Sequence, residues 1–137
     1  MARIRVVTAA SIDGFLPERD DKRMEWLRKD RRGLRNWHER CERRLYAGYP
    51  LVDLICEKEE GDQRSIYLAE ITEAGDVELL RGLFLYYIVD EMVIYLLPLT
   101  RREGVRVMDG FTASQWETVQ MRCYRNGICR IVYRKVS

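Results

Sequence analysis

A nearly continuous apolar run, MVIYLLPL at Met92–Leu99, constrains the fold of this chain more than any other feature. A strand with one face in water alternates apolar and polar side chains, whereas a strand that is buried on both faces is apolar throughout. We therefore expect a central strand, covered by other elements on both faces, with Pro98 marking its end. Hydrophobic residues make up 47% of the 137 residues and charged residues 34%, as is typical of one globular domain.

Two further stretches are rich in β-branched and apolar residues and are predicted to be strands: RIRVVTAA at Arg3–Ala10 and SIYLAEIT at Ser65–Thr72. The stretch LVDLICEK at Leu51–Lys58 is predicted to be another strand, and Val105–Met108 a short one. Several strands in one domain imply a sheet that also needs covering elements.

Two helices are predicted to supply that cover. Lys22–Tyr46 has apolar residues near helical spacing and predicts one long amphipathic helix, which Gly33 would weaken near its middle. Asp76–Tyr87 predicts a second helix with Asp76 as its N-cap. The order of strands and helices predicts an α/β fold with a mixed sheet.

The C-terminal part is predicted to be an antiparallel hairpin, because alternating segments flank Asn126-Gly127. A two-residue turn there would pair Tyr124 with Cys129 and Cys123 with Arg130, so the two sulfur atoms would point to opposite faces. We therefore expect no disulfide within the hairpin. The simplest interpretation of the four cysteines is reduced thiols in a cytoplasmic protein.

Several segments resemble the dihydrofolate reductase-like superfamily, and most of all the reductase domain of the bifunctional riboflavin-biosynthesis deaminase/reductase. They are VVTAASIDGFLP near the start, MEWL, ELLRGLFLYYIVDEMVIYLLPL at Glu78–Leu99, and the closing RNGICRIVYRK. The resemblance implies a three-layer αβα sandwich with a C-terminal antiparallel hairpin, formed by residues 1–137 as one domain. Relative to that family, the chain is predicted to be shortened around residues 46–66.

The resemblance also implies an activity: NADPH-dependent reduction of a small-molecule substrate, a phosphoribosylamino-pyrimidine. NADPH would lie across the carboxyl ends of the central strands, where a helix N-terminus can receive phosphates. By resemblance Asp13 is the catalytic candidate, and the cofactor-binding candidates are Ala9, Ser11, Gly14, Gly75, Asp76 and Val77. Relatives commonly form dimers, so a homodimer is expected.

Two departures from the family favour an alternative. Asp76 and Val77 stand where relatives carry glycines that let a diphosphate approach the backbone, and the family's Gly-Arg-x-Thr segment is missing. A negative charge beside phosphates is unfavourable. The alternative is therefore a degenerate, non-catalytic relative that acts as a binding or dimeric assembly module, and in it Asp13 and Gly14 form an ordinary turn.

Other partner classes are not expected. The net charge is +2, and acidic residues interrupt the basic stretch Arg28–Arg44, so no nucleic-acid partner is predicted. No apolar segment has the roughly 20 residues of a membrane span, so no membrane association is predicted. His38 and Cys41 would share a helix face, but two ligands do not make a metal site, and no metal is predicted.

Overall fold

The computed structural model describes residues 1–136 and contains a six-stranded sheet in the order β2-β3-β1-β4-β6-β5. Along the chain the elements are β1 (Arg3–Ser11), α1 (Lys22–Lys29), α2 (Leu34–His38), β2 (Arg43–Arg44), α3 (Leu51–Glu60), β3 (Ile66–Ile71), the 3-10 helix η1 (Ala74–Asp76), α4 (Val77–Leu85), β4 (Glu91–Leu97), the 3-10 helix η2 (Val107–Gly110), β5 (Trp116–Cys123) and β6 (Cys129–Lys135).

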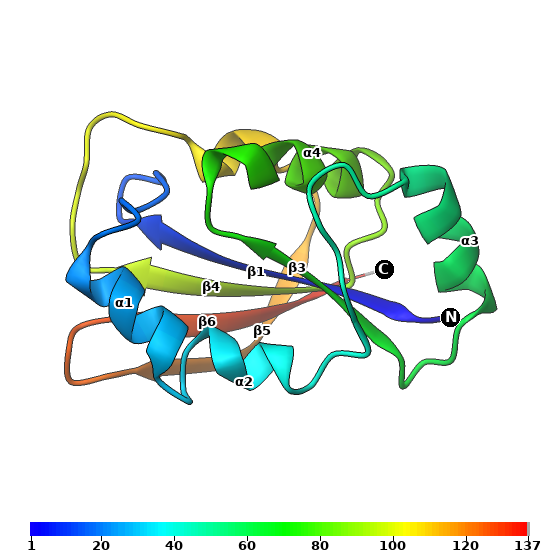
Figure 1. Ribbon diagram of the computed structural model, residues 1–137, viewed down its shortest axis with the longest axis horizontal. Coiled ribbons are helices and arrows are strands. Elements are labelled where there is room, and N and C mark those ends of the chain that lie inside the picture. The colour runs from blue at the N-terminus through cyan, green and yellow to red at the C-terminus, as the bar shows by residue number, and fades with distance from the viewer. Residues whose placement is uncertain (137) are drawn as a thin grey trace.

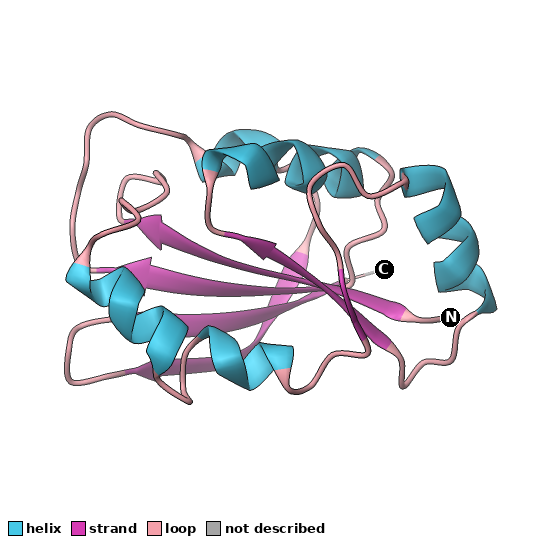
Figure 2. Ribbon diagram, viewed as in Figure 1, coloured by secondary structure: helices cyan, strands magenta, loops and turns pink. Residues whose placement is uncertain are grey.

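The sheet is mixed, as the sequence predicts. Strand β1 pairs in parallel with β3 and β4, and β2 pairs in parallel with β3. Strand β6 runs antiparallel to β4, and β5 runs antiparallel to β6. Helices α1 and α2 cover one face of the sheet and α4 covers the other, while α3 lies at the end where β1 begins (Figures 1 and 2). The predicted α/β sandwich and its C-terminal hairpin are confirmed.

Alternation along β1 builds two cores. Ile4, Val6 and Ala10 pack in the cluster under α4, whereas Val7 and Ala9 pack in the cluster under α1 and α2. Strand β4 lies between β1 and β6, and its Val93, Tyr95 and Leu97 are fully or almost fully buried. The expectation of a central strand at this apolar run is therefore correct.

The single long helix predicted for residues 22–46 is wrong. Helix α1 ends at Lys29 because Asp30 has an extended backbone, and α2 begins only at Leu34. A side chain at Gly33 would overlap the carbonyl oxygen of Leu27, so the chain folds back on itself at this glycine. The predicted weakness at Gly33 is thus a break, and Arg43–Arg44 then pairs with β3 as β2.

The strand predicted at Leu51–Lys58 is also wrong, because this segment is α3. Leu54 and Lys58 are buried at a spacing of four, which is the helical spacing. A short apolar run does not distinguish a strand from a helix by periodicity. Val105–Met108 forms no strand beyond an isolated bridge between Phe15 and Arg106. The single domain, shortened around residues 46–66, stays a prediction.

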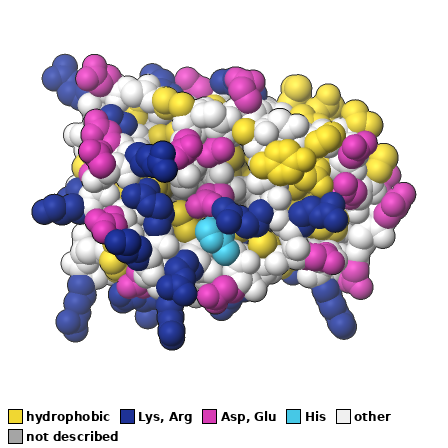
Figure 3. Space-filling view, viewed as in Figure 1, with side chains coloured by type: hydrophobic (Ala, Val, Ile, Leu, Met, Phe, Trp, Pro, Cys, Tyr) yellow, Lys and Arg dark blue, Asp and Glu magenta, His cyan; other side chains and the backbone are white. Residues whose placement is uncertain are grey.

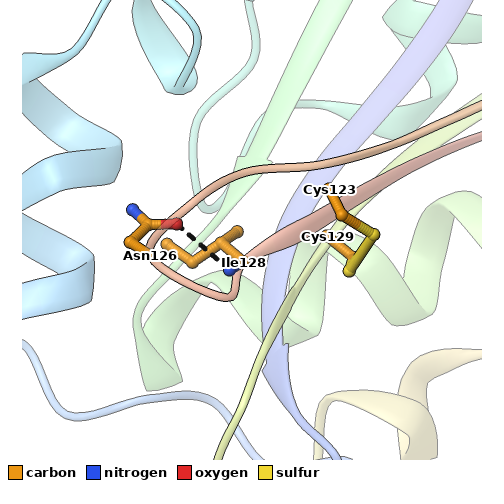
Figure 4. Close-up of a disulfide and its surroundings, with 4 residues drawn as sticks. All are labelled: Cys123, Asn126, Ile128 and Cys129. Carbon is orange, nitrogen blue, oxygen red and sulfur yellow. Dashed lines mark hydrogen bonds between the residues drawn. A yellow bond between two sulfur atoms is a disulfide. The ribbon is translucent and has the colours of Figure 1, made fainter.

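The hairpin is confirmed, but its predicted register is wrong by one residue (Figure 4). The amide of Tyr124 donates to the carbonyl of Ile128 at 2.9 Å, and Gly127 has a φ of 88°, so the turn has three residues with glycine in the left-handed position. Cys123 therefore lies opposite Cys129, with 4.1 Å between the Cα atoms, and the two form a disulfide. The expectation of reduced thiols at this pair fails, while Cys41 and Cys56 are free.

Within residues 1–136 we find no helix with the length and apolarity needed to cross a membrane.

Candidate functional site

The candidate site lies at the carboxyl edge of the sheet. Strands β1, β3 and β4 are parallel, so the segments that follow them meet at this edge. A cavity of about 260 Å³ opens there between the turn after β1, the loop after β3 and the loop after β4. Its lining residues are Leu16, Pro17, Arg19, Thr72, Glu73, Ala74, Arg101 and Val105. None of the seven residues predicted for the site is among them.

Asp13 joins two of these loops. Its carboxylate accepts hydrogen bonds from the Ser11 hydroxyl at 2.5 Å and from the backbone amides of Arg101 and Arg102 at 3.1 and 2.8 Å. The bond from Ser11, followed by the two amides, lowers the pKa of Asp13 to about 2 against the opposing effect of desolvation. Asp13 is therefore ionised at neutral pH, where it is a weak proton acceptor and cannot be a proton donor.

The other site residues predicted on β1 and its turn are bonded, covered or buried within the protein. The Ser11 hydroxyl also accepts from the amide of Phe15 at 3.0 Å. Gly14 has a φ of 89°, and a Cβ there would lie 3.1 Å from Cγ of Met108, so η2 covers this glycine. Ala9 is fully buried beneath α1 and α2 and does not reach the edge. The structure therefore brings Ser11, Asp13 and Gly14 together as a turn and leaves Ala9 in the core.

The loop before α4 is closed by its own carboxylates. Glu73 and Asp76 form a capping box: the Glu73 side chain accepts from the amide of Asp76, and the Asp76 carboxylate accepts from the amide of Glu73 at 3.0 Å. Asp76 also accepts from the amide of Thr72 at 3.2 Å. The sequence predicts that Asp76 caps α4. Asp76 does precede that helix, but its side chain makes no capping hydrogen bond to it and instead caps the 3-10 turn.

The loss of glycine was expected to hinder a diphosphate by bulk, but neither Gly75 nor Val77 obstructs this turn. Val77 points into the core with 6% of its surface exposed, so it does not fill the crevice. Gly75 is exposed, and a Cβ there would meet nothing within 4 Å. Charge and occupied amides, rather than bulk, therefore oppose a phosphate at this turn.

A dinucleotide diphosphate does not fit these residues. A helix terminus binds phosphate through free amides and a positive dipole end. Here two carboxylates occupy that position, and amides of Glu73 and Asp76 already have partners. A cavity of about 260 Å³ is also small for a cofactor, since pockets for drug-sized ligands span roughly 300–1,000 Å³.

Arg101 is a cavity residue that the sequence interpretation missed, as it missed the rest of the lining. Its guanidinium donates to the carbonyl of Leu16 at 2.5 Å and pairs with Glu18 at 3.1 Å, and its side chain is 19% exposed. Thr72 was missed as well, although it ends a predicted strand, and Arg101 follows closely on another. Their positions just after predicted strands could have identified them as site residues, because ligands bind at the carboxyl ends of parallel strands.

A metal centre finds no support in the described residues, since no three His, Cys, Asp or Glu side chains converge there. The single histidine, His38, lies among charged side chains on the face shown in Figure 3. Its Nε2 lies 3.1 Å from a carboxylate oxygen of Glu70, which also pairs with Arg44. The thiol of Cys41 donates to the carbonyl of His38 at 3.3 Å, while the imidazole of His38 contacts Glu70.

Comparisons with known proteins agree on the fold. No protein-family model matches the sequence, and no curated protein matches it by sequence. Among solved structures, RibD of Acinetobacter baumannii superposes with a TM-score of 0.66 at 12% identity, covering 99% of this chain and 58% of RibD. A riboflavin biosynthesis protein from Shewanella sp. PV-4 gives 0.58 at 16% identity, with both chains fully covered.

The Thermotoga maritima diaminohydroxyphosphoribosylaminopyrimidine deaminase/5-amino-6-(5-phosphoribosylamino)uracil reductase gives a TM-score of 0.52 at 13% identity, covering 98% of this chain and 57% of that protein. At such identities the likeness concerns the fold, and it agrees with the resemblance seen in the sequence. The chain therefore has an α/β fold similar to that of these riboflavin-biosynthesis proteins.

Proposed function

We propose that this chain is a non-catalytic relative of the riboflavin-biosynthesis reductases that acts as a binding or assembly module. The observation that carries the proposal is the capping box of Glu73 and Asp76, which places two carboxylates where a cofactor phosphate would bind. Asp13 supports it, because its carboxylate holds two loops together and its lowered pKa suits a structural role.

The test is a calorimetric titration of the full chain with NADPH, together with an assay of NADPH oxidation in the presence of a phosphoribosylamino-pyrimidine. We expect no saturable binding at millimolar NADPH and no oxidation. Saturable binding at micromolar NADPH, with turnover of the pyrimidine, would replace this proposal with the second candidate.

The second candidate is an NADPH-dependent reductase of a phosphoribosylamino-pyrimidine. The fold favours it, because the Thermotoga protein with that reductase name is similar over 98% of this chain. The turn of Ser11, Asp13 and Gly14 also lies at the carboxyl edge, beside the cavity. A bound small-molecule substrate would then contact Arg101, which lines the cavity.

A homodimer is part of the assembly proposal. Exposed apolar side chains gather near the corner where α3 meets the end of α4 (Figure 3). Val52, Leu85 and Tyr86 are 73%, 61% and 49% exposed, and burying such residues is a common reason for association. Light scattering that gives the mass of one chain at micromolar concentration would contradict a dimer. The cytoplasmic location and the absence of nucleic-acid and membrane partners stay predictions.

A further inference from the structure

A second cavity opens at the opposite, amino edge of the parallel strands. Its volume is about 860 Å³, roughly three times that of the carboxyl-edge cavity and within the range of small-molecule pockets. It lies at the end of the molecule where β1 begins beside α3 (Figure 1). The nine residues of β1, at about 3.3 Å each, separate the two cavities by on the order of 30 Å.

The lining of this cavity is strongly basic. Arg3, Lys58, Arg64, Arg134 and Lys135 line it, with Asp90 and Glu91 as the acidic residues. Both acids already have partners inside the protein: Asp90 pairs with Lys58 at 2.5 Å, and Glu91 pairs with Arg5 at 2.5 Å. Within residues 1–136, Arg3, Arg64 and Lys135 therefore have no carboxylate partner, and Arg134 has only the exposed pair with Glu117.

Those remaining cations have donors to spare. Within the described residues Arg3 uses only its Nε, which donates to the carbonyl of Gln63 at 3.1 Å. The Arg64 guanidinium contacts no hydrogen-bonding or acidic group within residues 1–136. Lys135 donates to the carbonyl of Tyr87 at 2.9 Å, and an ammonium has two further N–H groups. Arg134 reaches Glu117 only at 3.5 Å, on the exposed surface.

The base of the cavity is held rigidly by α3. Lys58 is 8% exposed, and its ammonium donates to the carbonyl of Ala2 at 2.8 Å as well as to Asp90. Asp90 in turn accepts from the amide of Ile4 at 2.8 Å. These bonds connect α3 to the starts of β1 and β4, so the backbone that carries the surrounding cations is held in place.

We infer that the amino-edge cavity binds a small phosphate ester. Guanidinium and ammonium groups with spare donors recognise phosphate oxygens by charge-assisted hydrogen bonds. A single phosphate ion is much smaller than the cavity, and the exposed Met1 and Tyr87 add apolar surface for the organic part of the ligand. This site is independent of the carboxyl edge, so it does not rest on the function proposed above.

Calorimetric titration of the full chain with adenosine monophosphate and, separately, with inorganic phosphate tests the inference. We expect saturable binding of both, with the nucleotide tighter. The double variant Arg3→Gln, Arg64→Gln should weaken nucleotide binding at least about tenfold, since it removes two charged donors. Circular dichroism checks its folding, and Arg64→Gln alone, at an exposed side chain, should weaken binding in the same direction.

The matched control is Arg31→Gln with Arg40→Gln, which removes two exposed charges from the turns that follow α1 and α2. It should leave the affinity unchanged. Equal weakening by both double variants would show general attraction to a basic protein and would overturn the site. So would the absence of saturable nucleotide binding at millimolar concentration, or binding of inorganic phosphate as tightly as the nucleotide.

Discussion

The two edges of the parallel strands satisfy their polar groups in different ways. At the carboxyl edge, Asp13, Glu73 and Asp76 turn back onto backbone amides of the same edge, and a cavity of about 260 Å³ remains. At the amino edge, Arg3 and Arg64 extend outward, and the cavity measures about 860 Å³. The edge that the fold predicts to bind a ligand is therefore the one whose polar groups are already paired within the protein.

Side-chain length explains this difference. A short aspartate side chain after a strand can accept from nearby backbone amides, as Asp76 does within its own loop, or from the amides of a neighbouring loop, as Asp13 does. Arginine and lysine are long and carry no acceptor, so they cannot satisfy backbone amides and reach into solvent or toward an anion. Acidic residues in a loop thus occupy the backbone amides of that edge. Basic residues leave their own N–H groups available to an anionic ligand.

The largest effect is expected at the amino edge. Lys58→Met should lower the free energy of unfolding by about 3 kcal/mol, because it leaves Asp90 without its partner at a site where the lysine is buried. Urea denaturation measures the change. Lys29→Met, which breaks an exposed pair with Glu25, is the control and should cost less than about 1 kcal/mol. Equal losses in the two variants would mean that the amino edge has no rigid base.

The next effect is expected in the hairpin. Reducing the disulfide between Cys123 and Cys129, which are six residues apart, should lower the free energy of unfolding by about 2 kcal/mol through the entropy of the unfolded chain. Denaturation with and without a phosphine reductant measures it, and the Cys123→Ser, Cys129→Ser variant should not respond. Finding four reactive thiols in the untreated folded chain, rather than two, would refute the bond.

A smaller effect should follow from opening the carboxyl edge. Asp76→Ala removes a cap from two amides and should cost about 1 kcal/mol in urea denaturation. It also frees those amides and removes a negative charge, so weak binding of pyrophosphate should increase severalfold. Asp53→Ala, an exposed acid in the first turn of α3, is the control and should change neither quantity by a comparable amount. Unchanged pyrophosphate binding in Asp76→Ala would mean that its carboxylate does not close this edge.

The smallest effect concerns pH. The pKa of Asp13 is about 2 in the folded chain, below its ordinary value of 3.8, so its contribution to stability is present above about pH 4 and is lost as pH falls toward 2. Asp13→Asn should flatten the stability profile in that window. Some slope remains, because Asp30 has a pKa of about 2 as well. Asp20→Asn serves as the exposed control, and a profile that Asp13→Asn leaves as steep as that control would contradict the bond network of Asp13.

Much of the fold was predictable because burial leaves a periodic trace. The apolar run at Met92–Leu99, the strand at Arg3–Ala10 and the Asn126-Gly127 turn each have few alternatives. The site was predictable only in location. The turn of Ser11, Asp13 and Gly14 does lie at the carboxyl edge, but the cavity is lined by neighbours such as Thr72 and Arg101, whose orientation depends on distant loops.

From the sequence alone came the α/β class and the central strand, since these follow from which residues must leave water. The family likeness came from the resemblance of particular segments. Only the tertiary structure decided that residues 51–60 are helical, that Gly33 breaks a helix against Leu27, and that a one-residue change of register joins Cys123 to Cys129. It also decided that Glu73 and Asp76 close one edge while Lys58 supports the other. The physical reason is that a sequence pattern records whether a group is buried, but not which distant partner satisfies its hydrogen bonds and charge.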